Sequence, residues 1–317
     1  MAWVVILSLQ LVRHGANLRK SAVAGALRLY VPQIKKAIKY VCIAMAPQVA
    51  LGWPQAQWCK ERTTMDLGLS GKRAIVIGGA RGIGLCVAET LAREGADVVI
   101  GARGEDSVKD AVAALRRYGT RVEGRAVHVG RPEDYQAWLD WAVGALGGVD
   151  VLIPMTSAGG GMGSEKYWTR GFETDVMAPV RAVEAVLPLM SAQHSGSIVL
   201  VATTAALEAM GGPQPYNALK ASLITWGKQL ALHHGRDGIR VNVVSPGPVE
   251  FPGGNWEMIK GTMEKFYQSQ LRQQPSGRLG TPEEIARAIV FLASEAASWC
   301  NGSHLVVDGG FTNRTPF

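Results

Sequence analysis

Residues 73–84 read RAIVIGGARGIG, a β-branched run that leads into a glycine-rich turn. The run at 73–77 predicts a short buried strand, and the apolar pattern at 83–93 predicts a helix directly after the turn. Gly78, Gly82 and Gly84 allow the backbone to turn tightly and to approach a pyrophosphate, while the helix N-terminus presents free N–H groups to the phosphates. A glycine triplet alone also fits an ordinary strand-to-helix turn, but its placement between strand and helix favours dinucleotide binding.

Short apolar runs alternate with helical patterns along the rest of the chain. The strand candidates lie at residues 73–77, 96–100, 122–129, 149–153, 197–202, 239–244 and 304–307. Strands that alternate with helices indicate a parallel sheet covered on both faces. We therefore predict a single α/β domain over residues 65–317, a Rossmann-like doubly wound parallel sheet of about seven strands.

The stretch 250–276 is the least regular part of this pattern. It follows the sixth strand, so we expect it near the carboxyl ends of the strands, where such sheets bind ligands. This position makes it a candidate lid over a substrate. Trp256, within it, could line an apolar pocket or pack on the body of the protein.

The charge of the chain is concentrated near its N-terminus. The full chain has 33 Lys and Arg residues against 26 Asp and Glu residues, a formal net charge of +7. Residues 1–64 hold nine of these basic residues and one acid, so residues 65–317 carry a net charge of −1. The near-neutral main domain excludes a nucleic-acid footprint. We interpret 1–64 as a basic extension outside the fold: residues upstream of the natural start, a targeting presequence, or a surface-binding basic helix.

Cysteine and hydropathy patterns restrict the compartment and the class of site. The four cysteines include no Cys-x2-Cys pair, and only Cys86 and Cys300 lie after residue 64. This argues against a disulfide framework and a zinc site, and the six histidines form no metal-ligand pattern. No stretch reaches the ~18 apolar residues of a spanning helix. We expect a cytoplasmic protein without a bound metal or membrane span, with organelle targeting by residues 1–64 left open.

The second strand is followed by a basic residue where an acid would indicate NAD. The chain reads Gly101-Ala102-Arg103 at this point. A carboxylate there binds the ribose 2′-hydroxyl of NAD, whereas an arginine accommodates the 2′-phosphate of NADP. Arg81, in the glycine turn, is expected to reach the same place. The pattern predicts NADP, with NAD the less favoured cofactor; two solvated surface arginines are the alternative interpretation.

Tyr216 and Lys220 lie four residues apart in a predicted helix and therefore share one face. A tyrosine with a reference pKa of ~10 transfers protons poorly near neutrality. A nearby ammonium and a cationic nicotinamide favour the phenolate, so we expect a lowered pKa for Tyr216. The pair could then exchange a proton with a carbonyl oxygen. Taken alone, the spacing also fits a pair on a helix surface.

With these motifs in place, residues 65–311 resemble the short-chain dehydrogenase/reductase family. The resemblance rests on Gly78-x3-Gly82-Ile83-Gly84, Tyr216-x3-Lys220, Arg240-Val241-Asn242 before Pro246-Gly247, Gly277-Arg278-Leu279-Gly280 before Pro282-Glu283-Glu284, and Val307-Asp308-Gly309-Gly310. It implies that Tyr216 is the general acid/base, and that Lys220 holds the nicotinamide ribose and lowers the pKa of Tyr216. It also implies a set of cofactor contacts: Gly78, Arg81, Gly82, Ile83, Gly84, Arg103, Val129, Tyr216, Lys220, Pro246, Gly247 and Val249.

The sequence departs from the family pattern at several positions. Thr203 stands where the family has the serine that polarises the substrate oxygen, and Asp175 stands where it has the asparagine that supports a proton-relay water. We retain both as catalytic candidates. The family's Asn-Asn-Ala-Gly is replaced within residues 154–159, where the register cannot be fixed. His128 replaces the adenine-contacting aspartate, and Phe251 replaces a threonine after the Pro-Gly element.

The resemblance implies an NADP-dependent oxidoreductase that moves hydride between nicotinamide and a ketone or secondary alcohol. Within the family the sequence is most similar to 3-oxoacyl-carrier-protein reductase-like members. The resemblance also implies a homotetramer or dimer through the helices that carry Asp175 and Tyr216. Because Asp175 and Thr203 depart from the pattern, the alternative is a non-catalytic or weakly active dinucleotide-binding redox sensor or scaffold.

Overall fold

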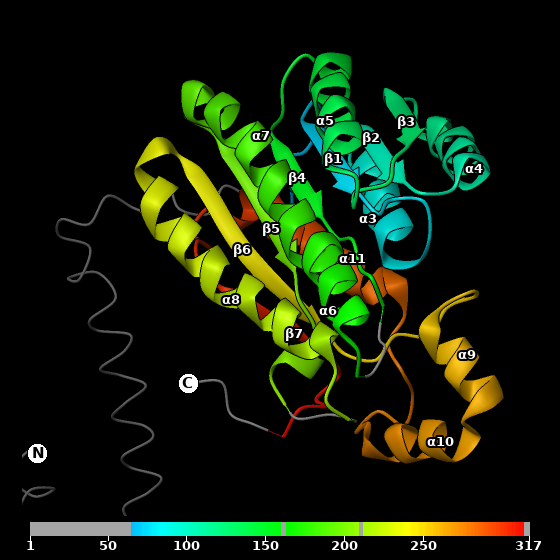
Figure 1. Ribbon diagram of the computed structural model, residues 1–317. Coiled ribbons are helices and arrows are strands. Elements are labelled where there is room, and N and C mark those ends of the chain that lie inside the picture. The colour runs from blue at the N-terminus through cyan, green and yellow to red at the C-terminus, as the bar shows by residue number, and fades with distance from the viewer. Residues whose placement is uncertain (1–64, 160–162, 209–211, 314–317) are drawn as a thin grey trace, which may run out of the picture. The chain divides into compact units, whose positions relative to one another are not determined.

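The computed structural model describes residues 65–159, 163–208 and 212–313. The extension proposed at 1–64 lies outside these residues. Seven strands form one fully parallel sheet in the order β3-β2-β1-β4-β5-β6-β7 (Figure 1). They are β1 (Arg73–Ile77), β2 (Asp97–Ala102), β3 (Val122–Ala126), β4 (Val151–Pro154), β5 (Gly196–Val201), β6 (Ile239–Pro246) and β7 (His304–Val307).

Helices follow the strands, as the alternating pattern predicts. The α-helices are α3 (Gly82–Arg93), α4 (Glu105–Leu115), α5 (Pro132–Leu146), α6 (Glu165–Gly171), α7 (Ala178–Gln193), α8 (Pro215–His234), α9 (Asn255–Thr262), α10 (Glu264–Gln273) and α11 (Pro282–Ala293). A π-helical turn, η2 (Phe172–Met177), joins α6 to α7. Short 3-10 turns are η1 (Arg116–Tyr118), η3 (Thr204–Ala206), η4 (Gly235–Asp237) and η5 (Glu295–Ala297). The Rossmann-like doubly wound fold expected from the sequence is confirmed.

Alternate residues of the strands bury opposite faces of the sheet. Ala74 and Val76 in β1 pack into a core with α3, α4 and α11, and Ile75 and Ile77 pack into a second core with α5, α7 and α8. Successive side chains of a strand point to opposite faces, so a strand buried on both sides is apolar throughout. This requirement explains why the central strands form continuous Val/Ile/Leu runs.

The order of the strands reverses at β1, which pairs with β2 on one side and with β4 on the other. The connections therefore leave β1 and β4 in opposite directions at the carboxyl ends of these two strands. Ligands of doubly wound sheets bind at such a switch point. The glycine turn after β1 lies at this place.

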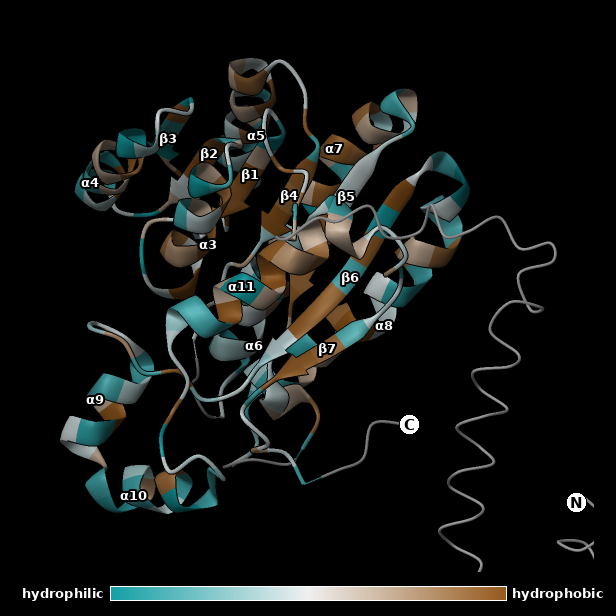
Figure 2. Ribbon diagram, turned by 180° about the vertical axis from the view of Figure 1, so that it is seen from behind, coloured by the Kyte–Doolittle hydropathy of each residue, from teal (hydrophilic) through white to brown (hydrophobic). Residues whose placement is uncertain are grey.

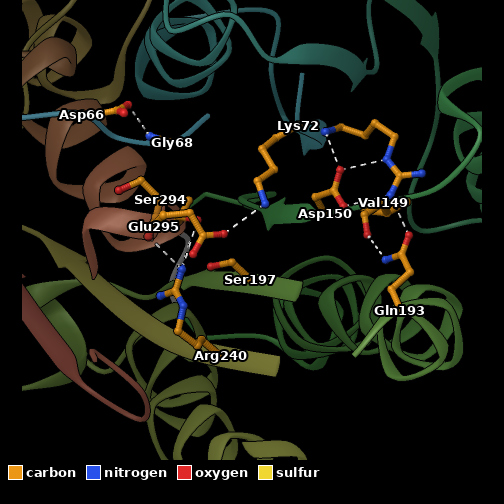
Figure 3. A network of polar contacts seen from close by, with 12 residues as sticks. Asp66, Gly68, Lys72, Val149, Asp150, Gln193, Ser197, Arg240, Ser294 and Glu295 are labelled. Atoms are coloured by element: carbon orange, nitrogen blue, oxygen red, sulfur yellow. Dashed lines mark hydrogen bonds and ion pairs between the residues drawn. The ribbon is translucent and has the colours of Figure 1, made fainter. Parts of the chain in front are cut away.

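The amino ends of the strands are fastened by charged side chains (Figure 3). Arg73, at the start of β1, pairs with Asp150 ahead of β4 at 2.8 Å, and Lys72 pairs with Glu295 at 3.0 Å. Arg240, at the start of β6, donates to main-chain carbonyls at the end of α11, including Leu292 at 2.8 Å. A hollow of about 540 Å³ lies at this end. It is at the opposite end of the sheet from the glycine turn, so these contacts position the strands and not the ligand.

The stretch 250–276, expected to be irregular, is largely helical. It forms α9 and α10, which lie past the end of the sheet at which β6 ends and are mostly hydrophilic (Figures 1 and 2). In these two helices only Tyr267 is buried. The apolar residues of α10 do gather on one face, but both helices are short and the chain is interrupted between them at Met263, so the helices were missed.

Strand boundaries differ modestly from those expected. The third strand ends at Ala126 and not at Val129, and the sixth extends to Pro246. Val127 and Val129 are buried in the core with α5, and the N–H of Val127 still donates to the carbonyl oxygen of Ala102 in β2 at 2.8 Å. Among the described residues, no helix has both the length and the apolar character needed to cross a membrane.

Candidate active site

The glycine turn connects β1 to α3 and requires glycine on steric grounds. Gly78 and Gly82 have φ angles of 93° and 52°, which side chains other than glycine rarely adopt. A Cβ on Gly84 would lie 2.1 Å from the carbonyl oxygen of Gly78. The backbone is therefore packed too closely for any side chain, and the first N–H groups of α3 stay uncovered by Cβ atoms. A pyrophosphate fits this cradle.

The two arginines proposed for the 2′-phosphate lie at turns after adjacent strands. Arg81 is exposed at the N-cap of α3, and its guanidinium donates to the carbonyl oxygen of Gly253 at 3.3 Å. Arg103 is exposed directly after β2, whose last residue is Ala102. The end of β2 thus presents a cation and no carboxylate. Val129 lies on the neighbouring loop after β3 and is buried.

Tyr216 and Lys220 lie one turn apart near the start of α8. The side chain of Lys220 is 3% exposed, and its ammonium lies 3.4 Å from the carboxylate of Asp175, which is 0% exposed. The same ammonium donates to the main-chain oxygens of Thr156 at 3.0 Å and Val201 at 3.1 Å. These partners match the three N–H donors of lysine. The ammonium is thus directed at Asp175 and the ends of β4 and β5.

Asp175 comes to this cluster through the π-helical turn η2. Its carboxylate accepts from the main-chain N–H of Ala158 at 3.2 Å. The hydroxyl of Thr156 donates to the carbonyl oxygen of Thr174 at 2.7 Å, which fixes the loop after β4 against the turn. These bonds attach residues 156–158 to the turn that carries Asp175.

Burial dominates the electrostatics of the cluster. It raises the pKa of Asp175 and lowers the pKa of Lys220, although each opposes the shift of the other through its charge. Burial and the charge of Asp175 raise the pKa of Tyr216 to about 12, against hydrogen bonding to Thr203 and Ser157. The residues of the chain alone therefore shift this pKa upward. The lowered pKa was expected from Lys220 and a cationic nicotinamide together, and that expectation stays a prediction.

Thr203 follows β5 and caps the short turn η3, where its hydroxyl accepts from the N–H of Ala205 at 3.3 Å. Hydrogen bonding to Thr203 opposes the upward shift of the Tyr216 pKa. Sequence reasoning missed Ser157, whose hydroxyl lowers the pKa of both Tyr216 and Asp175 through hydrogen bonding, against the stronger effect of burial. The motif that would have indicated it was the altered Asn-Asn-Ala-Gly segment, whose alignment could not be fixed.

Known proteins resemble this chain in sequence and in fold. A family model described as enoyl-(acyl carrier protein) reductase matches residues 78–312. Dehydrogenase/reductase SDR family member 4 of Oryctolagus cuniculus is 38% identical over 253 residues, which cover 78% of this chain and 95% of the relative. This chain belongs to the short-chain dehydrogenase/reductase family. Its expected membership is confirmed, and it is an oxidoreductase of that family.

Solved short-chain dehydrogenase/reductase structures share the fold. An L-sorbose reductase from Gluconobacter frateurii, complexed with NADPH and L-sorbose, superposes with a TM-score of 0.74 at 34% identity. The match covers 79% of this chain and all of that one. An actinorhodin polyketide ketoreductase variant with NADPH gives a TM-score of 0.72 at 29% identity, over 77% of this chain and 98% of that one.

The Pro-Gly element of this short-chain dehydrogenase/reductase ends β6 beside the β7 turn. The N–H of Gly247 donates to the carbonyl oxygen of Val307 at 2.9 Å, and a Cβ on Gly247 would lie 2.6 Å from that of Asp308. Pro246 and Val249 are buried, and Val249 bridges to Gly280. The element is fixed to the body at both ends, and the lid candidate begins directly after it.

The lid candidate is joined to the glycine turn by an aromatic contact. A Cβ on Gly82 would lie 2.5 Å from the ring of Phe251, so the ring lies directly over the first residue of α3. Trp256 stacks on Phe266 of α10, with ring centroids 6.2 Å apart and planes at 7°. This contact lies within the lid candidate itself, so it tests neither interpretation of Trp256, lining an apolar pocket or packing on the body of the protein.

Proposed function

We propose that this protein is an NADP-dependent oxidoreductase that interconverts a ketone and a secondary alcohol, with Tyr216 as general acid/base. The carrying observation is the cluster of Tyr216, Thr203 and Lys220 at the carboxyl ends of β4 and β5, on the side of the sheet where the glycine turn opens. Parallel sheets place their reactions at this edge.

The positive charges at the turns after β1 and β2 favour NADP over NAD. Arg81 and Arg103 are exposed cations at the turns after β1 and β2, and β2 ends without a carboxylate. The L-sorbose reductase and the polyketide ketoreductase that share the fold were both solved with NADPH. When bound, the nicotinamide would supply or accept the hydride.

The residues of this chain would handle the oxygen of the substrate. Tyr216 would donate a proton to that oxygen in the reductive direction, and the hydroxyl of Thr203 would orient it. Charge that develops on the oxygen is stabilised where hydrogen-bond donors are already positioned. Lys220 would contact the nicotinamide ribose after giving up one of its present main-chain partners. A dimer or tetramer formed through α7 and α8 belongs to the same proposal.

A panel of ketones, ketoses and secondary alcohols with each nicotinamide cofactor tests this function, and L-sorbose belongs in the panel because a similar structure binds it. We expect turnover with NADPH in the wild-type protein and none in Tyr216→Phe. Calorimetric titration should show that Tyr216→Phe still binds NADPH. Binding without turnover across the panel would instead support the alternative of a redox sensor or scaffold.

A further inference from the structure

Lys220 and Asp175 form an ion pair that is closed to solvent. The two side chains are 3% and 0% exposed, and the Lys220 ammonium lies 3.4 Å from the Asp175 carboxylate. The ammonium also donates to the carbonyl oxygens of Thr156 at 3.0 Å and Val201 at 3.1 Å, at the carboxyl ends of β4 and β5. One positive and one negative group in contact leave this centre without net charge. Because water does not screen these groups, an imbalance between them would act strongly on any charge nearby.

An asparagine at position 175, the residue that the family resemblance leads one to expect, would change the charge of the centre and little else. Its side chain has nearly the same shape, and its amide oxygen could accept from the N–H of Ala158, as the carboxylate does at 3.2 Å. The ammonium of Lys220 would keep its main-chain acceptors but lose its counter-charge. Asp175 is therefore the group that makes the centre neutral.

Other charged and titratable groups around the ion pair do not take over this role. Glu173, also in η2, is paired with Arg181 of α7 at 2.9 Å, and both side chains are partly exposed. Arg170 of α6 is exposed, and its guanidinium donates to a main-chain carbonyl oxygen at 2.9 Å. Tyr216 is protonated at neutral pH, because burial and the charge of Asp175 raise its pKa to about 12. The charge of the buried centre thus depends on the ion pair itself.

The nicotinamide ring changes its charge in the proposed reaction. It is neutral in NADPH and carries a positive charge in NADP⁺, after the hydride has left. Under the proposed function Lys220 contacts the ribose attached to this ring, so its ammonium would lie near the place where the charge appears. An uncompensated ammonium would repel the oxidised ring and leave the reduced ring unaffected. A neutral ion pair repels neither.

We propose that Asp175 raises the affinity of the site for NADP⁺ relative to NADPH by compensating the charge of Lys220. This inference rests on the function proposed above and deepens it, since it gives Asp175 a part in selecting the redox state of the cofactor. Asp175 acts through Lys220 and need not contact the cofactor. The departure from the family pattern at position 175 is then a means of retaining the oxidised cofactor, with which an alcohol would be oxidised.

Asp175→Asn in the full-length chain is the test. Calorimetric titration gives the Kd values for NADP⁺ and NADPH between pH 6 and pH 9, and their ratio is the readout. We expect Kd(NADP⁺)/Kd(NADPH) at the acidic end to rise about tenfold in the variant, which corresponds to ~1.4 kcal/mol. The two cofactors carry the same phosphates, so contacts with the glycine turn and the arginines cancel in the ratio. A purely structural loss would weaken the binding of both cofactors alike.

The pH dependence of the ratio identifies Lys220 as the source of the effect. Burial lowers the pKa of Lys220, and the charge of Asp175 opposes that shift. In Asp175→Asn this opposition is absent, so the ammonium loses its proton at a lower pH than in the wild type. The ratio of the variant should therefore be highest at the acidic end and fall toward the wild-type value as the pH is raised.

Glu173→Gln is the matched control. It removes one negative charge from the same turn, but that charge is paired with Arg181, and the Glu173 side chain is 35% exposed. Solvent and salt screen such a charge, so the ratio should stay at the wild-type value. Asp175→Ser removes the buried charge with a smaller side chain and should raise the ratio as Asp175→Asn does. It takes the place of Asp175→Asn if that variant does not fold.

A ratio that is unchanged or lowered across this pH range in the folded variant would overturn the inference, as would an equal rise in Glu173→Gln. In that case, loss of turnover in Tyr216→Phe would show that only this inference fails. If the wild type binds neither cofactor, or if Tyr216→Phe retains its rate, the proposed function itself fails.

Discussion

The ring of Phe251 lies on Gly82, so that the segment leading into α9 covers the start of α3. The N–H groups at that helix end are the ones that would bind a pyrophosphate. The ring therefore narrows the approach to them. A threonine at this position would leave the same N–H groups more open.

Phe251→Thr should bind NADPH about tenfold more tightly, which corresponds to ~1.4 kcal/mol. The reason is that the smaller side chain need not be displaced from Gly82. Calorimetric titration measures the change. Phe266→Thr, which removes a ring from α10 without touching Gly82, is the control and should leave the affinity unaltered. Weaker binding by Phe251→Thr would mean that the ring supports the cofactor and does not obstruct it.

Arg103→Ala should weaken NADPH binding by about tenfold or more, since a charge-assisted hydrogen bond contributes ~1.5–3 kcal/mol. Arg81→Ala should have a similar effect. NADH has no 2′-phosphate, so its affinity for either variant should match the wild type and serves as the internal control. Equal wild-type affinities for the two cofactors, measured by fluorescence titration, would refute the assignment of NADP.

Gly84→Ala should disrupt the turn after β1. Its Cβ would be placed 2.1 Å from the oxygen of Gly78, and overpacking of this kind costs about 1–3 kcal/mol of unfolding free energy. NADPH affinity should fall with it. Gly144→Ala, in α5, meets nothing within 4 Å and should be neutral or stabilising by up to ~1 kcal/mol. Chemical denaturation of both variants compares them directly.

The capping box of α11 should make the free energy of unfolding depend on pH in the acidic range. Hydrogen bonds from Arg278 and from the N–H of Thr281 lower the pKa of Glu284 from 4.5 to about 2. The contribution of Glu284 to the free energy of unfolding is therefore complete above pH 4.5 and is lost as the pH falls through about 2.

Glu284→Gln should then destabilise the protein at pH 7, and its difference from the wild type should shrink as the pH falls from 4.5 toward 2, as Glu284 becomes protonated. Because the carboxylate is 39% exposed, the difference at pH 7 should not exceed about 1 kcal/mol. Urea denaturation across this range measures it, with Glu133→Gln in α5 as a surface control. A difference that persisted unchanged at pH 2 would contradict the assignment.

Residues 65–317 expressed alone should fold, bind NADPH and turn over substrate as the full chain does. The seven strands of the described sheet lie within this range, so we expect the core to form without the residues before Met65. Melting temperature and kcat of the two proteins provide the comparison. Insoluble protein or a large fall in melting temperature would place the domain boundary earlier than residue 65.

The sheet could be predicted because its central strands are apolar on both faces and are followed by recognisable turns or helices. The lid candidate at 250–276 was located, but its two helices were not, since each is short and together they bury only Tyr267. Tyr216 and Lys220 were identifiable from their spacing. The upward shift of the Tyr216 pKa was not, because it comes from burial and from the charge of Asp175, which lies 41 residues away in the sequence.

The direction in which the Asp175 carboxylate points depends on the π-helical turn η2 and not only on the identity of the residue. A π-turn is an α-helix with one residue inserted, and each residue of an α-helix advances by roughly 100° about the axis. Removing one residue from η2 would leave the carboxylate in the chain yet rotate it away from Lys220 and Ala158. The contact of Asp175 with Lys220 and Ala158 therefore requires both an aspartate at position 175 and the present number of residues in the helix around it. A single-residue deletion could disable the centre without replacing any of the groups that compose it.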